Sequence, residues 1–412
     1  MQSVVTAGPA GDLDREERRS QASWVRALPW FALFFPSALY AVHFFLGGGL
    51  NHRILDSWAY LQISEGQQVA VPFNTRILSS SVAALMSAAT GLSASTVFDL
   101  LTPASLLGSL FLLRKIIGRR GGTDEWQAAV LLVFGCSLAV TFGYTPVLVD
   151  PILLLFVCLT IAALDAGHLV VALVLVCAAT LTKEYGLVLG VVWAFHAYRR
   201  GFLKFAFLGL IPPAVTLLIL VITRQSDSGP GLPSWNAFAF HMMFEYQLSV
   251  FRLRGITDYG KLIYLWSWCA VWPAFFIALC TLFYSRMRRV KLSVDQASFA
   301  IVLATLPVLL LGDWVRSLIV TVPFVCIVAT AHALARDRWF VFLLAVGGLS
   351  TALARPFHSG TPSPSLLTLM MTIVSVASSL AIGMILVRYV NSSGAKELNS
   401  GLRRTADEVA IQ

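Results

Sequence analysis

The sequence predicts an all-α protein that crosses a membrane many times. Of its 412 residues, 57% are hydrophobic and only 12% are charged, which is about half the charged share of a soluble globular chain. The apolar residues fall into runs of the length needed to cross a bilayer, roughly 20 residues. Lys and Arg residues are concentrated between alternate runs, a distribution typical of polytopic membrane proteins. We therefore expect a polytopic transmembrane helical bundle of about 12 spans.

The composition also excludes other classes of protein. The low charge and the abundance of Leu, Val, Ala and Phe exclude a disordered chain. Six Cys residues in 412, none of them in a CxxC or CxxH spacing, exclude a small secreted domain held together by disulfides.

The spans follow one another with short connections along most of the chain. The first run is too long for the apolar part of a signal peptide and has no small-residue cleavage site after it, so we interpret it as a true span. Two later runs are short and come as a pair, at 168–182 and 186–198. In chain order the predicted spans are 25–47, 94–113, 126–143, 147–164, 168–182, 186–198, 202–222, 262–285, 296–311, 317–335, 338–354 and 365–390.

The basic residues predict the orientation of this bundle. With the N-terminus inside, the inner segments hold 21 of the 30 Lys and Arg residues and the outer segments hold nine. Nine acidic residues balance the outer ones, so the whole net charge of +9 lies on the inner side and gives no reason to expect a nucleic-acid partner. We expect cytoplasmic tails at 1–24 and 391–412 around a single transmembrane catalytic domain at 25–390, in the plasma (inner) membrane.

Two outer segments are long, at 48–93 and 223–260. The second half of the first segment has the spacing of an amphipathic helix, so we expect interfacial helices there and not a further span. Its apolar face would hold Leu78, Val82, Leu85, Ala89 and Leu92, with Ser80, Ser81, Ser87 and Thr90 elsewhere on the helix.

Charged residues embedded in apolar sequence fall at the predicted outer ends of the spans. A charge inside the bilayer costs about 2.5–3.5 kcal/mol, so such residues need a reason to be present. Acids there could act as general bases or metal ligands, and bases could hold an anion such as phosphate. Taken singly, each has a structural alternative; Lys183 and Glu184, for example, could neutralise each other. No His has a partner at helical ligand spacing, so we expect no metal held by His.

The order of several short motifs resembles that of the GT-C superfamily of integral-membrane glycosyltransferases. The resemblance covers roughly residues 25–335 and rests on the common order and sidedness of these motifs. They are Asp56-x-x-x-Tyr60, Pro72-Phe73-x-x-Arg76, Asp150-Pro151, Leu181-Thr182-Lys183-Glu184, and Asp313-x-x-Arg316 followed by Pro323.

The resemblance implies sugar transfer on the outer face, from a polyprenyl-phosphate-linked donor to a lipid, glycan or protein acceptor. Asp56 would be the catalytic base and Asp150 the second acid. The residues implied to bind substrate, several of them through the lipid phosphate, are Tyr60, Arg76, Lys183, Glu184, Asp313, Arg316, Arg355 and His358. Many members carry paired acids in the first loop, whereas Asp56 stands alone. We therefore expect a metal-free mechanism, with Mg²⁺ or Mn²⁺ as the alternative.

The lengths of the segments agree with a donor that arrives in the membrane plane. No stretch outside the spans reaches 50 residues, and no GxGxxG or P-loop pattern is present, so there is no room for a nucleotide-sugar domain. Two other functions fit a multi-span chain. A transporter or lipid flippase would place its charges near the midplane, and a polysaccharide ligase or polymerase would carry its chemistry in one large late loop.

Overall fold

The computed structural model describes a bundle of helices, and no strand occurs among the residues it describes. These are residues 10–46, 55–67, 76–143, 147–183, 186–212, 323–327 and 333–354, with a few further positions between 69 and 389. For these residues the all-α prediction is confirmed. The helices are α1 (Ala10–Leu46), α2 (Leu55–Ser64), α3 (Ile77–Thr90), α4 (Ala94–Arg119), α5 (Asp124–Gly143), α6 (Asp150–Asp165), α7 (Leu169–Thr182), α8 (Leu187–Arg199), α16 (Arg338–Ala354) and the 3₁₀ helices η4 (Leu203–Leu210) and η8 (Ala333–Arg336).

The helices coincide with the apolar runs of the sequence. α1 contains the first predicted span, α4 to α8 follow the next five, and α16 occupies the span predicted at 338–354. Two of these helices, over Val25–Phe45 and Ala94–Arg119, are long and apolar enough to cross a membrane. Two other predicted spans, 262–285 and 296–311, lie outside the described residues. Of the predicted bundle of about 12 spans, the structure therefore confirms the helical fold and two candidate spans.

Glycines allow α1 and α5 to pack closely side by side. A Cβ atom at Gly135 would lie 2.6 Å from Cγ of Pro36, and one at Gly143 would lie 2.6 Å from Cβ of His43. Neither position has room for a larger residue unless the neighbouring helix moves. Because the two contacts occur in the same order along both helices, α1 and α5 run in the same direction.

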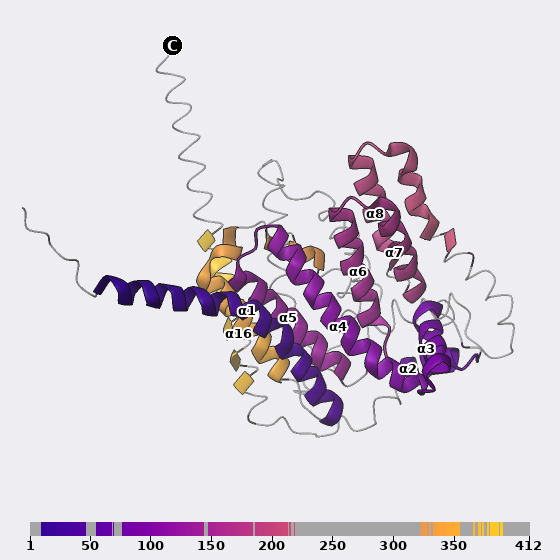
Figure 1. Ribbon diagram of the computed structural model, residues 1–412, viewed down its shortest axis with the longest axis horizontal. Helices are drawn as coiled ribbons and strands as arrows, with labels where there is room; N and C mark the ends of the chain where they lie inside the picture. The colour runs from indigo at the N-terminus through magenta and orange to yellow at the C-terminus, as the bar shows by residue number, and fades with distance from the viewer. Residues whose placement is uncertain are drawn as a thin grey trace, which may run out of the picture.

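A buried tryptophan joins the C-terminal part of the chain to α5. Trp126, in the first turn of α5, donates a hydrogen bond from Nε1 to Oγ1 of Thr330 over 2.8 Å. Its ring also stacks on Phe340 of α16, with 6.5 Å between the ring centroids. The starts of α5 and α16 therefore lie together (Figure 1).

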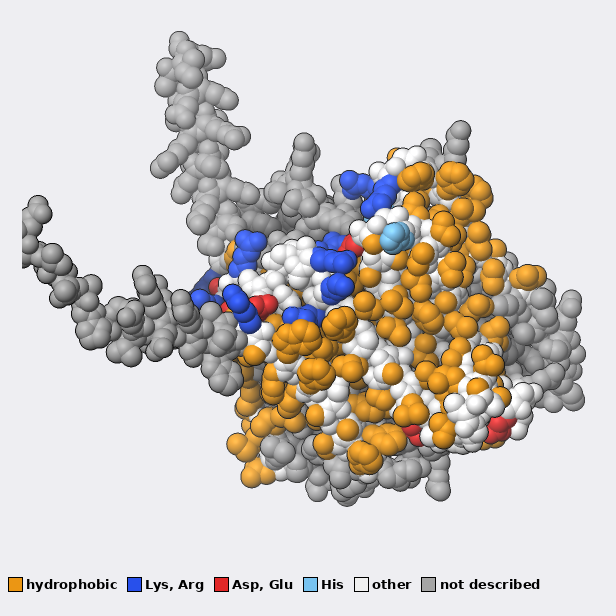
Figure 2. All heavy atoms as spheres, viewed as in Figure 1, with side chains coloured by type: hydrophobic (Ala, Val, Ile, Leu, Met, Phe, Trp, Pro, Cys, Tyr) orange, Lys and Arg blue, Asp and Glu red, His pale blue; other side chains and the backbone are white. Residues whose placement is uncertain are grey.

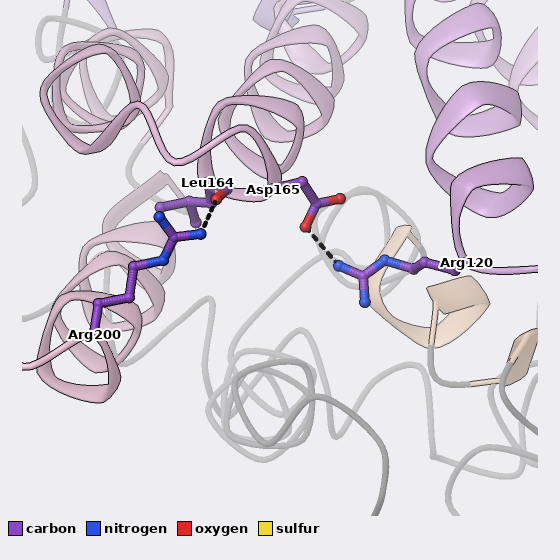
Figure 3. A network of polar contacts seen from close by, with 4 residues as sticks. All are labelled: Arg120, Leu164, Asp165 and Arg200. Carbon is purple, nitrogen blue, oxygen red and sulfur yellow. Dashed lines mark hydrogen bonds and ion pairs between the residues drawn. The ribbon is translucent and has the colours of Figure 1, made fainter.

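Charged side chains connect the ends of three other helices. Arg120 directly follows α4, and its Nη2 lies 2.7 Å from Oδ1 of Asp165, the last residue of α6. Arg200 follows α8 and donates from Nη2 to the carbonyl oxygen of Leu164 over 3.5 Å (Figure 3). Thus α4, α6 and α8 end at the same side of the bundle. We call this side the basic end; its described basic side chains include Arg114, Lys115, Arg119, Arg120, Arg199, Arg200, Arg336 and Arg338.

The outside of the bundle is strongly apolar. Hydrophobic side chains cover much of the face in Figure 2, and the Lys and Arg side chains in view gather in its upper left part. Soluble monomers rarely expose a contiguous apolar area of more than a few hundred Å². Large hydrophobic side chains that are more than half exposed include Phe31, Phe34, Phe45, Leu85, Leu100, Val170, Val171, Val174, Val191, Phe205, Phe207 and Leu210.

Candidate functional site

Tyr60 and Arg76, from the two halves of the first predicted outer segment, are in contact. Arg76 is the residue directly before α3, and Tyr60 lies on α2. The guanidinium donates from Nη1 to the hydroxyl oxygen of Tyr60 over 2.8 Å, and both side chains are buried. Asp56 also lies on α2, one helical turn before Tyr60; its side chain lies outside the described residues.

A second pair joins the start of α6 to the end of α7. Asp150 is the first residue of α6, and Lys183 directly follows α7. Lys183 Nζ lies 2.6 Å from Oδ1 of Asp150, and the two side chains are 3% and 0% exposed. The sequence offers Glu184, the neighbour in the chain, as a candidate counter-ion of Lys183. The structure instead pairs Lys183 with an acid 33 residues earlier in the sequence.

The helix ends suit the charges that they carry. A helix has a partial positive charge at its N-terminus and a partial negative charge at its C-terminus. Asp150 is the first residue of α6, so its carboxylate lies at the N-terminus of that helix, and Lys183 directly follows α7. The dipole of α6 therefore favours the ionised form of Asp150, which lowers the cost of burying its charge.

A tight turn after α7 holds Lys183 in place. The backbone N–H of Gly186 donates to the carbonyl oxygen of Lys183 over 2.9 Å. A Cβ atom at Gly186 would lie only 2.4 Å from the backbone carbon of Ala179. Only glycine therefore lets the chain return this close to α7.

The two pairs lie on neighbouring elements at one end of the bundle. α3 packs against both α2 and α7, and Figure 1 shows α2 and α3 beside the end of α7 that carries Lys183. Asp150 begins α6, so this end is opposite to the basic end, where α6 finishes at Asp165. We call it the site end, defined by Tyr60, Arg76, Asp150 and Lys183.

The structure thus brings four of the residues predicted to form the site to one end of the bundle, as two pairs, Tyr60 with Arg76 and Asp150 with Lys183. Of the other predicted residues, Asp56 is described only as a backbone position of α2, and five lie outside the described part of the chain. These five are Glu184, Asp313, Arg316, Arg355 and His358.

Other polar residues, not predicted as part of the site, lie close by. The hydroxyl groups of Ser57 on α2 and of Ser79 and Ser80 on α3 are buried and have no hydrogen-bond partner among the described residues. Asp99 on α4 interacts electrostatically with Tyr40 of α1. Within the described part of the chain, no three His, Cys, Asp or Glu residues lie close enough together to hold a metal ion.

Comparison with known proteins identifies no relative. No protein-family model, no curated protein and no solved structure matches this chain. Only the chain's own residues and the resemblance of its motifs therefore bear on its function.

Proposed function

We propose that this chain is a multi-span membrane protein whose site end faces the outside of the cell. The support comes first from α3, whose faces are arranged as in a helix that borders lipid. Val82 and Leu85 are exposed, whereas Ser79, Ser80 and Ala83 are buried against the protein. In water the apolar face of such a helix would turn inward. An apolar face that points away from the protein is favourable when acyl chains surround it.

The distribution of charge supports the orientation. The basic end collects the positively charged residues that the sequence places on the inner side, and cytoplasmic segments of membrane proteins carry an excess of Lys and Arg. The site end, at the opposite ends of the same helices, then lies at the outer surface.

The reaction that we propose is sugar transfer from a polyprenyl-phosphate-linked donor to an acceptor at that surface. The observation that carries the proposal is that two cationic side chains, Arg76 and Lys183, are buried at the ends of apolar helices. Buried cations near a membrane surface are costly and indicate a function. A lipid phosphate is an anion that guanidinium and ammonium groups bind well, and its hydrocarbon chain would lie along the apolar outside of the bundle.

The chemistry requires a base and a stabilised leaving group. The acceptor hydroxyl attacks the anomeric carbon of the sugar and gives its proton to the carboxylate of Asp56. The bond between the anomeric carbon and the phosphate oxygen breaks, and its electron pair leaves with the polyprenyl phosphate. This anion needs nearby positive charge more than it needs a proton. The role of Asp56 rests on the resemblance to GT-C glycosyltransferases. Direct displacement would invert the configuration at the anomeric carbon of the sugar.

Arg76 and Lys183 would hold the departing phosphate, each with a neighbour that orients it. The hydroxyl group of Tyr60 accepts one hydrogen bond from Arg76 and fixes the plane of the guanidinium. Asp150 bonds to Lys183 and keeps the lysine charged despite its burial. We therefore assign Asp150 to the positioning of Lys183, in place of the direct role of second acid that the resemblance implies.

The experiment that tests this function compares two acidic residues, Asp56 on α2 and Glu65 in the turn that follows it. Asp56→Asn should abolish transfer, whereas Glu65→Gln, at an exposed position nine residues later, should leave it unchanged. Vesicles containing the purified chain are offered polyprenyl-phosphate-linked hexoses and pentoses together with lipid, glycan and peptide acceptors, and the released polyprenyl phosphate is measured. EDTA should have little effect. Undiminished transfer by Asp56→Asn would exclude the proposed base, and loss of transfer in EDTA that Mg²⁺ or Mn²⁺ restores would exclude the metal-free mechanism.

A further inference from the structure

A cationic and aromatic cluster at the basic end has no part in the proposed reaction. The guanidinium of Arg114, in α4, lies over the ring of Trp30, in α1, with 4.1 Å between Cζ and the ring centroid. Arg114 is half-buried, and Trp30 is 44% exposed. An exposed Trp is typical of the boundary between the acyl chains and the headgroups of a membrane.

Beside this pair, a basic residue lies on one side and aromatic residues lie on the other. Arg26 lies four residues before Trp30 on α1, so the two share one face of the helix, and Arg26 is exposed. Phe34 lies one turn after Trp30 on the same face and is exposed. On α4, Phe111 lies one turn from Arg114 and is also exposed. α1 packs against α4, so these five residues form one strip along the two helices. Its basic groups, Arg26 and Arg114, lie at one end, and the rings of Phe34 and Phe111 lie at the other.

We propose that this strip, formed by Arg26, Trp30, Phe34, Phe111 and Arg114, binds an anionic phospholipid of the inner leaflet. The phosphate would lie against the guanidinium groups of Arg26 and Arg114, and an acyl chain would lie along Phe34 and Phe111. Stacking on an aromatic face leaves the edge of a guanidinium plane directed outward, where it can donate to phosphate oxygens. The indole of Trp30 fixes the depth of the headgroup.

Charge and position favour lipid over other anionic partners. The strip is continuous with the apolar outside of the bundle, and the basic side chains in view lie along the edge of that apolar surface (Figure 2). A nucleic acid or an acidic protein would contact the arginines but would leave uncovered the apolar surface that continues from the aromatic rings, whereas a phospholipid covers both parts. The site lies at the opposite end from Tyr60, Arg76, Asp150 and Lys183, so it is independent of the proposed catalysis.

The test uses the full chain in detergent, titrated with phosphatidylglycerol or phosphatidylcholine, and counts bound lipids by native mass spectrometry. The wild type should bind phosphatidylglycerol more tightly. Arg114→Gln should weaken that binding roughly fivefold, the amount expected for one basic residue near an anionic surface, and Trp30→Leu should weaken it as well. Arg114→Lys should retain part of the preference, which separates a lost site from a protein that has not folded.

The matched control is Arg119→Gln, an exposed arginine of the same helix. Unchanged phosphatidylglycerol binding in this variant, together with the loss in Arg114→Gln, would support a defined site. Equal losses in both variants would show a diffuse effect of surface charge and overturn the proposal, as would equal binding of the two lipids by the wild type. Neither result depends on whether the chain transfers sugar.

Discussion

Replacing one partner of the buried pair Asp150–Lys183 should destabilise the protein strongly, whereas replacing both should cost much less. The two charged atoms are 2.6 Å apart, and the side chains are almost fully buried. With an effective dielectric constant of about 20, their attraction at this distance is about 6 kcal/mol. Removing one partner leaves the other charge buried without compensation, at a cost of about 3–5 kcal/mol. We expect this loss for Lys183→Met and for Asp150→Asn.

The double variant separates the pair from other effects of each substitution. In Asp150→Asn/Lys183→Met no buried charge is left, so most of the lost stability should return, and the double-mutant cycle should give a coupling energy of about 3 kcal/mol. Unfolding is measured in mixed micelles of rising SDS content. A thiol-reactive dye reports it, because Cys136, Cys158 and Cys326 are free and buried in the folded protein.

The same chain contains a control pair of nearly the same geometry. Arg120 and Asp165 lie 2.7 Å apart, but their side chains are 24% and 23% exposed. Water screens such a pair, so Arg120→Gln should cost less than about 1 kcal/mol. If Lys183→Met costs no more than Arg120→Gln, burial does not control the energy of the first pair and the reasoning fails.

Two further predictions concern the groups that hold the site end. Tyr60→Phe removes the acceptor of the buried hydrogen bond from Arg76 and should cost about 1.5–3 kcal/mol, measured by the same SDS unfolding; a loss below about 0.5 kcal/mol would mean that water replaces the hydroxyl. Gly186→Ala forces a Cβ atom against the backbone of Ala179 and should cost about 1–3 kcal/mol. Gly383→Ala is its control, since the new Cβ would meet no atom within 4 Å; equal unfolding of the two variants would contradict the role of the tight turn.

The positions of the helices could be predicted from the sequence because hydropathy depends on local composition. α16 begins at Arg338, where the predicted span begins, and α7 and α8 are as short as the apolar runs that predicted them. Partners across the bundle are a different problem. Adjacency in the sequence suggests Glu184 as the partner of Lys183, whereas the described partner, Asp150, comes from the preceding helix. Consecutive spans at 147–164 and 168–182 run antiparallel, so the start of one lies beside the end of the next, and this geometry is the signal in the sequence that favours Asp150.

Hydropathy alone could not predict which face of each helix is buried, because this depends on whether water or lipid surrounds the helix. On α7, Val170 and Val174 are exposed by 77% and 63%, whereas Ala172 is fully buried. A soluble bundle would bury the valines, because removing a valine side chain from water gains more free energy than removing the smaller alanine side chain. In lipid the large apolar side chains gain nothing by turning inward, and small residues at the interface let helices approach closely. The exposed valines therefore support the proposal that acyl chains surround α7, although this helix is only 14 residues long. In that proposal the polar groups at its end, Lys183 among them, lie near a membrane surface.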